Sequence, residues 1–146
     1  SEKYLGGKIN PADKDKFTQY TKWRKNSLEN VNLTIKQLTG SAMGEAEANR
    51  IIGTLPSPDD SPSEFQAKLD GAEEQTKMAL ARFTYIKRNK GMSIEQMPLD
   101  TVPKVINDRG AVLEAETKRK FPNMKPDEIS KIVRRNLAQE FGLIAD

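Results

Sequence analysis

The sequence contains no cysteine and no histidine among its 146 residues. Without cysteine there can be no disulfide, thiolate metal site or cysteine nucleophile. Without histidine the chain lacks the commonest general base, the commonest metal ligand and the usual pH switch. An enzyme would have to work with carboxylates, lysine or serine alone, so we expect a protein that does not catalyse a reaction.

Aromatic residues and long apolar runs are also scarce. Aromatics make up 6% of the chain, with a single tryptophan, Trp23, and this argues against a β-sandwich. No apolar stretch approaches the roughly 20 residues that a membrane-spanning helix needs. The sequence contains no phosphate-binding loop, dinucleotide fingerprint, zinc-ligand spacing or calcium-binding loop, so no cofactor and no metal are expected.

Charged residues are plentiful, at 31% of the chain, and the net charge of +3 is unevenly distributed. Residues 3–25 and 117–136 each carry seven basic and two acidic groups. Residues 41–75 carry eight acidic and two basic groups, whereas residues 76–92 carry five basic groups and no acidic one. Such alternation predicts electrostatic pairing, either between helices of one chain or between copies in a homo-oligomer.

Apolar residues at helical spacing, punctuated by proline and glycine, predict an all-α protein without strands. The five expected helices cover about residues 11–39, 42–52, 62–90, 102–120 and 126–141. The expected N-caps of the first four are Asn10, Ser41, Ser61, and Asp100 or Thr101, and Pro126-Asp127-Glu128 is expected to start the fifth. Their expected C-terminal stops are Gly40, Gly53, Asn89 with Gly91, and Gly142.

The two longest helices are predicted to form a hairpin. The helix over residues 62–90 carries an unbroken heptad seam, formed by Phe65, Leu69, Ala72, Thr76, Ala79, Phe83 and Ile86. Between the hairpin arms, three prolines in residues 54–62 predict a stiff, extended connector. The expected organisation is therefore an extended arm (1–10), a long hairpin with a proline-rich corner (11–91) and a C-terminal helical pair (92–146).

The chain does not begin with methionine, so we expect a processed product or a fragment of a longer protein. Adjacent Asp59 and Asp60 are interpreted as solvated, turn-forming carboxylates and not as a metal pair. The first half of the helix over 11–39 is amphipathic and basic, so an anionic membrane surface is an alternative to core packing for its apolar face.

Basic residues crowd the C-terminal ends of the predicted helices over 62–90 and 102–120, where the helix dipole favours cations, and further basic residues flank Trp23 and lie on the last helix. A functional alternative is a phosphate-contacting surface that binds DNA without sequence preference and with strong salt dependence. The residues concerned are Lys22, Arg24, Lys25, Lys87, Arg88, Lys118, Arg119, Lys120, Arg134 and Arg135. Aromatic residues for base stacking are nearly absent among them, so specific single-strand recognition is not expected.

One corner of the sequence, between residues 38 and 69, combines helix-ending, capping and proline-linker signals. Its defining residues are Leu38, Thr39, Gly40, Arg50, Pro56, Asp60, Ser61 and Pro62. This pattern resembles a segment of the internal virion proteins of tailed bacteriophages, which take part in DNA ejection. In that family a long helix ends at a Leu-Thr-Gly-like corner, a short glutamate-rich helix follows, and a linker with Asp-Ser-Pro leads to the next helix. Ser41 and Gly44 depart from the pattern.

The resemblance implies a structural, non-enzymatic protein rich in long helices. Such proteins form homo-oligomers, lie inside the virion near the portal and tail proteins, and help the genome to cross the host envelope. DNA and membrane contacts are then both conceivable for this chain. The alternatives from the residues alone are a helical adaptor that binds a partner helix and a non-specific DNA-binding protein, either of them cytoplasmic.

Overall fold

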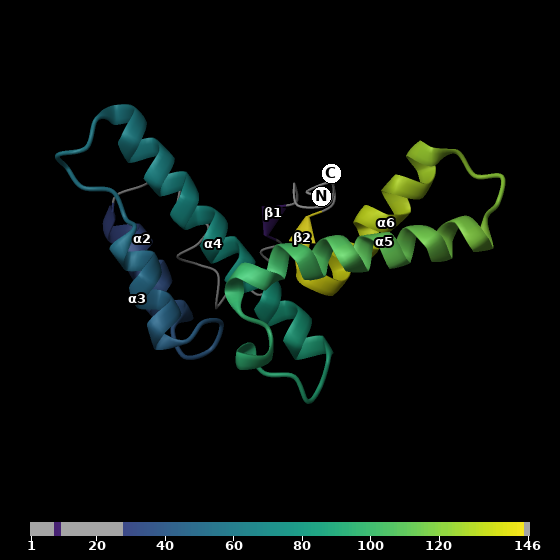
Figure 1. The fold of residues 1–146 in the computed structure, drawn as a ribbon, viewed down its shortest axis with the longest axis horizontal. Helices are drawn as coiled ribbons and strands as arrows, with labels where there is room; N and C mark the ends of the chain where they lie inside the picture. The colour runs from purple at the N-terminus through teal and green to yellow at the C-terminus, as the bar shows by residue number, and fades with distance from the viewer. Residues whose placement is uncertain (1–7, 10–27, 145–146) are drawn as a thin grey trace. The chain divides into compact units, whose positions relative to one another are not determined.

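In the computed structural model of the chain, the described residues, 8–9 and 28–144, are mainly helical, which confirms the all-α prediction (Figure 1). The helices are α2 (Leu28–Leu38), α3 (Glu45–Gly53), α4 (Pro62–Arg88), α5 (Val102–Lys120) and α6 (Pro126–Phe141). Two single-turn 3₁₀ helices, η2 (Ile94–Gln96) and η3 (Leu99–Thr101), precede α5. Most of the helix predicted over 11–39, and the arm before Lys8, lie outside the described residues.

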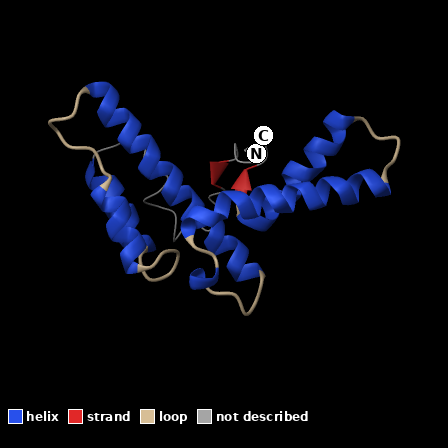
Figure 2. Cartoon of the chain, viewed as in Figure 1, coloured by secondary structure: helices blue, strands red, loops and turns tan. Residues whose placement is uncertain are grey.

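One short strand pair was not predicted. Strand β1 (Lys8–Ile9) pairs antiparallel with β2 (Leu143–Ile144), and Lys8 lies opposite Ile144 (Figure 2). Two residues are too few to show an alternating pattern, so the sequence carried no signal for this pairing.

The described residues form two compact units, and the division falls within α4, between Ala79 and Leu80. The first unit contains residues 28–79, and the second contains residues 80–144 together with 8–9. The division expected from the sequence lay between residues 91 and 92, after the end of this helix.

In the first unit, α2 ends where predicted and packs against α3. Gly40 takes a φ of 95°, a conformation that residues with a Cβ rarely adopt. Beside it, the Thr39 hydroxyl donates to the Ile35 carbonyl (2.7 Å). The buried residues of this part are Val31, Thr34, Ile35, Leu38, Ala42, Met43, Ala48 and Ile51.

The prediction that Ser41 caps a helix over 42–52 was wrong. The helix, α3, begins at Glu45 and Gly44 is its N-cap. The Glu47 carboxylate accepts a hydrogen bond from the Gly44 N–H (3.1 Å), which satisfies one of the amides that every helix start leaves open. Glycine at position 44 therefore precedes the helix instead of interrupting it.

A tight turn over residues 40–43 separates α2 from α3, so the helix does not begin before Gly44. The Gly40 N–H donates to the Met43 carbonyl (2.8 Å), and the Ala42 N–H donates to the Leu38 carbonyl (2.9 Å). The Ser41 hydroxyl also donates to the Leu38 carbonyl (3.4 Å). The Ser41 hydroxyl is thus directed to the preceding helix, and Gly44 occupies the N-cap position of α3.

Helix α4 begins at Pro62 as predicted, and the Ser61 hydroxyl accepts a hydrogen bond from the Glu64 N–H (3.3 Å). At the other end Gly91 has a φ of 94°, and the Asn89 side-chain amide donates to the Tyr85 carbonyl (2.7 Å). The middle of the predicted seam is buried, namely Leu69, Ala72, Thr76 and Ala79. Its pairing with the helix over 11–39 stays a prediction.

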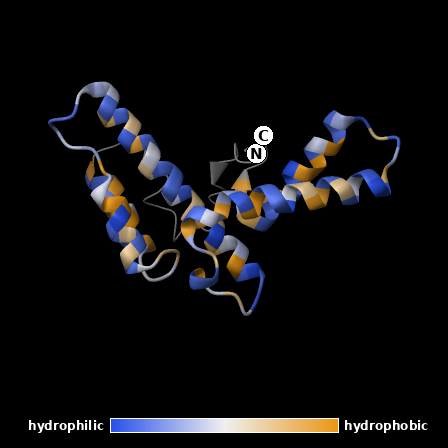
Figure 3. Cartoon of the chain, viewed as in Figure 1, coloured by the Kyte–Doolittle hydropathy of each residue, from blue (hydrophilic) through white to orange (hydrophobic). Residues whose placement is uncertain are grey.

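In the second unit, α5 and α6 form an antiparallel hairpin. Helix α6 starts at Pro126 and closes at Gly142 (φ 64°), as predicted. The buried residues of the hairpin are Val102, Ile106, Gly110, Leu113, Thr117, Ile129, Val133, Leu137 and Phe141. Apolar and hydrophilic residues alternate along the helices, and none of the described helices is apolar all round (Figure 3).

The end of α4 packs onto the end of α6. The Tyr85 and Phe141 rings stack with centroids 4.7 Å apart and planes 8° from parallel. Arg82 is fully buried, and its Nη1 donates to the Met97 carbonyl (3.0 Å) in the segment before α5. Burial of a charged group is costly unless it is hydrogen-bonded, so the bond from Nη1 to the Met97 carbonyl ties that segment to α4.

The start of α5 was placed correctly, but its expected side-chain cap is absent. The Thr101 hydroxyl donates to the Pro98 carbonyl (2.6 Å), and Asp100 lies inside η3. Helix α5 directly continues the preceding 3₁₀ turn, whose backbone already lies in the helical region, so no side-chain cap is needed.

Among the described helices, none is long and apolar enough to cross a membrane.

Candidate functional site

The connector between α3 and α4 contains a hydrogen-bonded turn and is less extended than predicted. The Asp60 N–H donates to the Ser57 carbonyl (3.0 Å), and the Ser57 N–H donates to the Asp60 carboxylate (2.8 Å). Lys68, on the second turn of α4, reaches back and places its Nζ 3.0 Å from both carboxylate oxygens of Asp60. This carboxylate therefore joins the turn to the following helix.

These bonds change the acidity of Asp60. The hydrogen bond from the Ser57 amide, followed by the bond from Lys68, holds the pKa of the Asp60 carboxyl below its ordinary value. The folded-state pKa is lowered, so the stabilisation is present above the unfolded-state pKa of about 3.9. It is lost as the pH falls through the folded-state pKa.

We therefore expect Asp60→Asn to lower the free energy of unfolding at neutral pH, and the difference from the parent chain to vanish in acid. Urea denaturation at neutral pH and at successively lower pH values measures this convergence. Asp59→Asn is the matched control, because the Asp59 side chain is exposed and forms no ion pair among the described residues. A constant difference for Asp60→Asn across the whole pH range would contradict the role of the carboxylate.

Most of the other corner residues are buried or form helix ends. Leu38 and Pro56 are buried, whereas Thr39, Gly40 and Ser61 form the helix ends already described. Arg50, in the last turn of α3, is exposed and forms no ion pair among the described residues. Of the predicted corner residues it is the exposed one that carries a positive charge.

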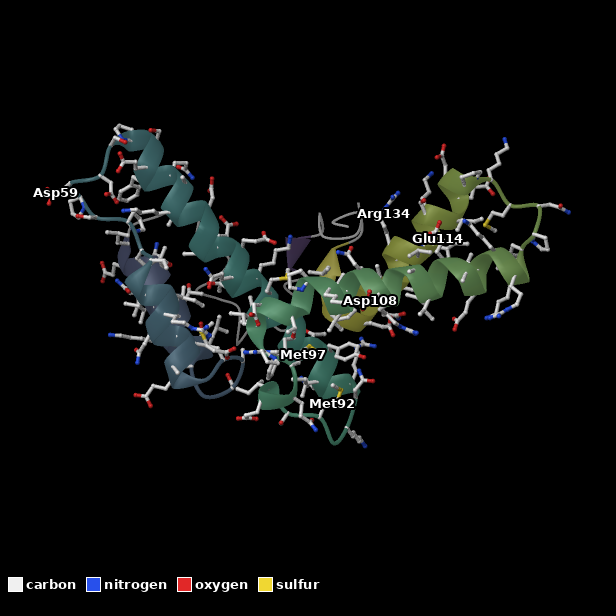
Figure 4. The ribbon with its side chains drawn as sticks, in the orientation of Figure 1. Asp59, Met92, Met97, Asp108, Glu114 and Arg134 are labelled. Atoms are coloured by element: carbon white, nitrogen blue, oxygen red, sulfur yellow. The ribbon has the colours of Figure 1, made fainter. Side chains whose placement is uncertain are left out.

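No group of three side chains able to hold a metal ion occurs in the part of the chain that the structure describes. Asp59 and Asp60 do not converge on a common point, since the Asp60 carboxylate is bound to Lys68 and the Ser57 amide. Figure 4 shows Asp59 at the outer end of the connector.

Among the described residues, the free end of the α5–α6 hairpin is basic and exposed. We call residues 118–125 the hairpin tip; they are the last turn of α5 and the loop before α6, with four basic and no acidic side chains. Arg119, Lys120 and Lys125 are exposed and form no ion pair among the described residues. Lys118 is paired with Glu114, one turn back (3.2 Å). At the centre of the tip, Phe121 is 48% exposed.

The loop of the hairpin tip has a defined backbone. The Phe121 N–H donates to the Thr117 carbonyl (2.9 Å), and the Met124 N–H donates to the Phe121 carbonyl (3.1 Å). These bonds hold Phe121 at the helix end, with Lys120 before it and Pro122 after it. Its exposure is thus a property of an ordered turn.

The base of the hairpin is joined by an ion pair. The Arg109 Nε lies 3.0 Å from both carboxylate oxygens of Glu140, linking α5 to α6. The hydrogen bond to Glu140 raises the pKa of Arg109 above its already high value. Because both side chains are about one-third exposed, this pair contributes modestly to stability, but it helps to set how the two helices align.

The other predicted phosphate contacts are not gathered at the hairpin tip. Lys87 and Arg88 end α4, and Figure 1 shows this end well separated from the tip. Arg134 and Arg135 lie on the third turn of α6, where Arg135 is exposed and Arg134 is half-buried. Figure 4 labels Arg134 on this helix. Lys22, Arg24 and Lys25 lie outside the described residues.

Two notable residues were missed in the sequence. Phe121 follows three cations and precedes a proline. These neighbours predict a loop, but they do not show whether other side chains cover the Phe121 ring. Arg82 occurs in the basic block over residues 76–92 and was not singled out there, yet it is buried. No local signal distinguishes it from its exposed neighbours.

Comparisons with models of protein families, with curated proteins and with solved structures found no match to this chain. Proposals about its function therefore draw on its own residues and on the resemblance over residues 38–69.

Proposed function

We propose that the chain is a structural, oligomerising component of a phage DNA-ejection apparatus, and that it acts by assembly and not by catalysis. The observation that carries the proposal is the corner over residues 38–69. Its family-like residues occupy consecutive helix ends, caps and a braced connector, so they act together as one structural element.

The charge distribution supports assembly. Acidic groups dominate residues 41–75 and basic groups dominate residues 76–92 and 117–136. Copies of the chain can therefore meet through surfaces of opposite sign, an arrangement that closes into a ring when each copy contacts the next in the same way.

Mass photometry and electron microscopy of the full chain test this proposal. We expect a particle of many copies near physiological salt, dissociating at about 1 M salt, where the Debye length falls to about 3 Å. A monomer at all accessible concentrations would refute the assembly role. Assembly without portal and tail genes beside this gene would leave an oligomer but refute the phage assignment.

A second candidate is a helical adaptor that binds a partner helix. The observation in its favour is the exposure of two large apolar side chains in the first unit, Leu33 on α2 and Ile52 on α3. A stable monomer that captures an amphipathic peptide, with affinity lost in Leu33→Ser, would favour this role over the first.

A further inference from the structure

We propose that the hairpin tip, residues 118–125, is a docking surface for an anionic membrane, with Phe121 inserted among the lipid headgroups. This inference goes beyond the proposed function and rests on the second unit alone. It concerns surface attachment, which requires no membrane-spanning helix.

The first argument is the coincidence of charge and exposed apolar surface. Large hydrophobic side chains that are clearly exposed are few among the described residues: Leu33, Ile52, Val112 and Phe121. Phe121 is the one aromatic among them, and it lies within a segment that carries four cations and no acid. An exposed aromatic ring surrounded by lysine and arginine matches a headgroup region that is anionic outside and apolar beneath.

The second argument is position. The tip is where α5 ends and the chain reverses into α6, so it forms the free end of the hairpin (Figure 1). A flat surface can reach such an end without meeting the rest of the hairpin. The long stems of Arg119, Lys120 and Lys125 allow their charges to stay at the headgroup level while the ring enters more deeply.

The third argument separates lipid from nucleic acid. A duplex-binding surface places cations along a groove or helix face so that they follow successive phosphates. Here the cations are concentrated at one end, and the remaining basic residues of α4 and α6 are not gathered there. A solvent-exposed phenylalanine adds nothing to phosphate contacts, but it contributes directly to partition into a bilayer.

The chain provides matched controls within the same unit. Val112 is 46% exposed, nearly the same as Phe121, but Asp108 and Glu116 lie one helical turn on either side of it. Arg88 and Lys90 are exposed cations at the end of α4, as Arg119 and Lys120 are at the end of α5. The controls therefore change the same chemistry at a different place.

The first experiment measures co-sedimentation of the full chain with phosphatidylcholine vesicles that contain either no or about 30% phosphatidylserine. We expect binding to the anionic vesicles only, weakened about tenfold by Phe121→Ser. The double variant Arg119→Glu/Lys120→Glu should abolish it, because repulsion replaces attraction. Val112→Ser and Arg88→Glu/Lys90→Glu should bind like the parent chain. Thermal melts of each variant establish that it is folded.

A second readout uses the absence of cysteine. A single Phe121→Cys or Val112→Cys substitution can be labelled with an environment-sensitive fluorophore at that position alone. With anionic vesicles we expect a blue shift of emission at position 121 and none at position 112.

The proposal is overturned if the chain binds both vesicle types equally, or neither, or if Phe121→Ser and Val112→Ser have the same effect. It is also overturned in favour of nucleic acid if the tip variants reduce binding to duplex or single-stranded DNA while vesicle binding is unchanged. Neither result affects the assembly test of the proposed function, which reads copy number.

Discussion

Replacing Phe141 with alanine is expected to lower the free energy of unfolding of the second unit by about 3–5 kcal/mol. The Phe141 ring is fully buried at the end of α6 and stacks on Tyr85 of α4. Truncation removes the buried ring, leaves a cavity that the surrounding helices fill only in part, and abolishes the stacking, itself worth roughly 0.5–1.5 kcal/mol.

Chemical denaturation followed by circular dichroism measures this loss. Phe121→Ala is the matched control, because it makes the same chemical change at a residue that is 48% exposed. We expect this control to change the stability by no more than about 0.5 kcal/mol. If the two variants lost equal stability, Phe141 could not be the packing residue that joins α4 to α6.

The second large effect is expected from Gly142→Ala, which should destabilise the second unit by about 2–4 kcal/mol. Gly142 has a φ of 64°, a left-handed conformation that is unfavourable for alanine. In addition, a Cβ at this position would lie 2.6 Å from the Thr84 hydroxyl oxygen and 3.0 Å from its methyl group. Backbone strain and steric collision therefore act together.

A control separates the two causes. Gly91 also has a positive φ, of 94°, but nothing lies within 4 Å of the position that its Cβ would take. Gly91→Ala should therefore show the strain alone, about 1–2 kcal/mol.

The collision itself is tested in the double variant Gly142→Ala/Thr84→Ala. Removing the Thr84 hydroxyl and methyl groups leaves its Cβ 3.2 Å away, a contact that a small shift can relieve. We expect part of the lost stability to return, measured as a favourable coupling in a double-mutant cycle. Strict additivity of the two substitutions would show that the loss at Gly142 is backbone strain only.

The sequence predicted helix ends correctly where the residues at the end itself determine it. Pro126 and Gly142 mark both ends of α6, because proline suits the first helical turn and glycine suits the left-handed residue after the last. The start of α3 was predicted too early because the same local preference was applied to Ser41. Ser41 is a good N-cap by composition, but the turn at Gly40 directs its hydroxyl to the preceding helix.

The features of the hairpin tip were likewise predictable from the sequence only in part. Three of the four cations of the hairpin tip, Lys118, Arg119 and Lys120, were identified from the sequence as a cluster at a helix end, whereas Lys125 was not. Their isolation from Lys87 and Arg88, and the exposure of Phe121 among them, became visible only in the folded chain. Clustering along the chain is evident from neighbouring residues in the sequence, whereas exposure depends on which distant segments cover a side chain.

The sequence by itself determined the helical class, the bounds of most described helices and the absence of cysteine and histidine chemistry. These properties depend on composition or on residues within a few positions of one another. Tertiary structure alone decided that Arg82 is buried against the Met97 carbonyl, that Gly142 must stay small because Thr84 lies beside it, and that Phe121 stays uncovered. Each of these depends on where separate segments meet or fail to meet, and packing between segments distant in the chain has no local pattern from which it can be read.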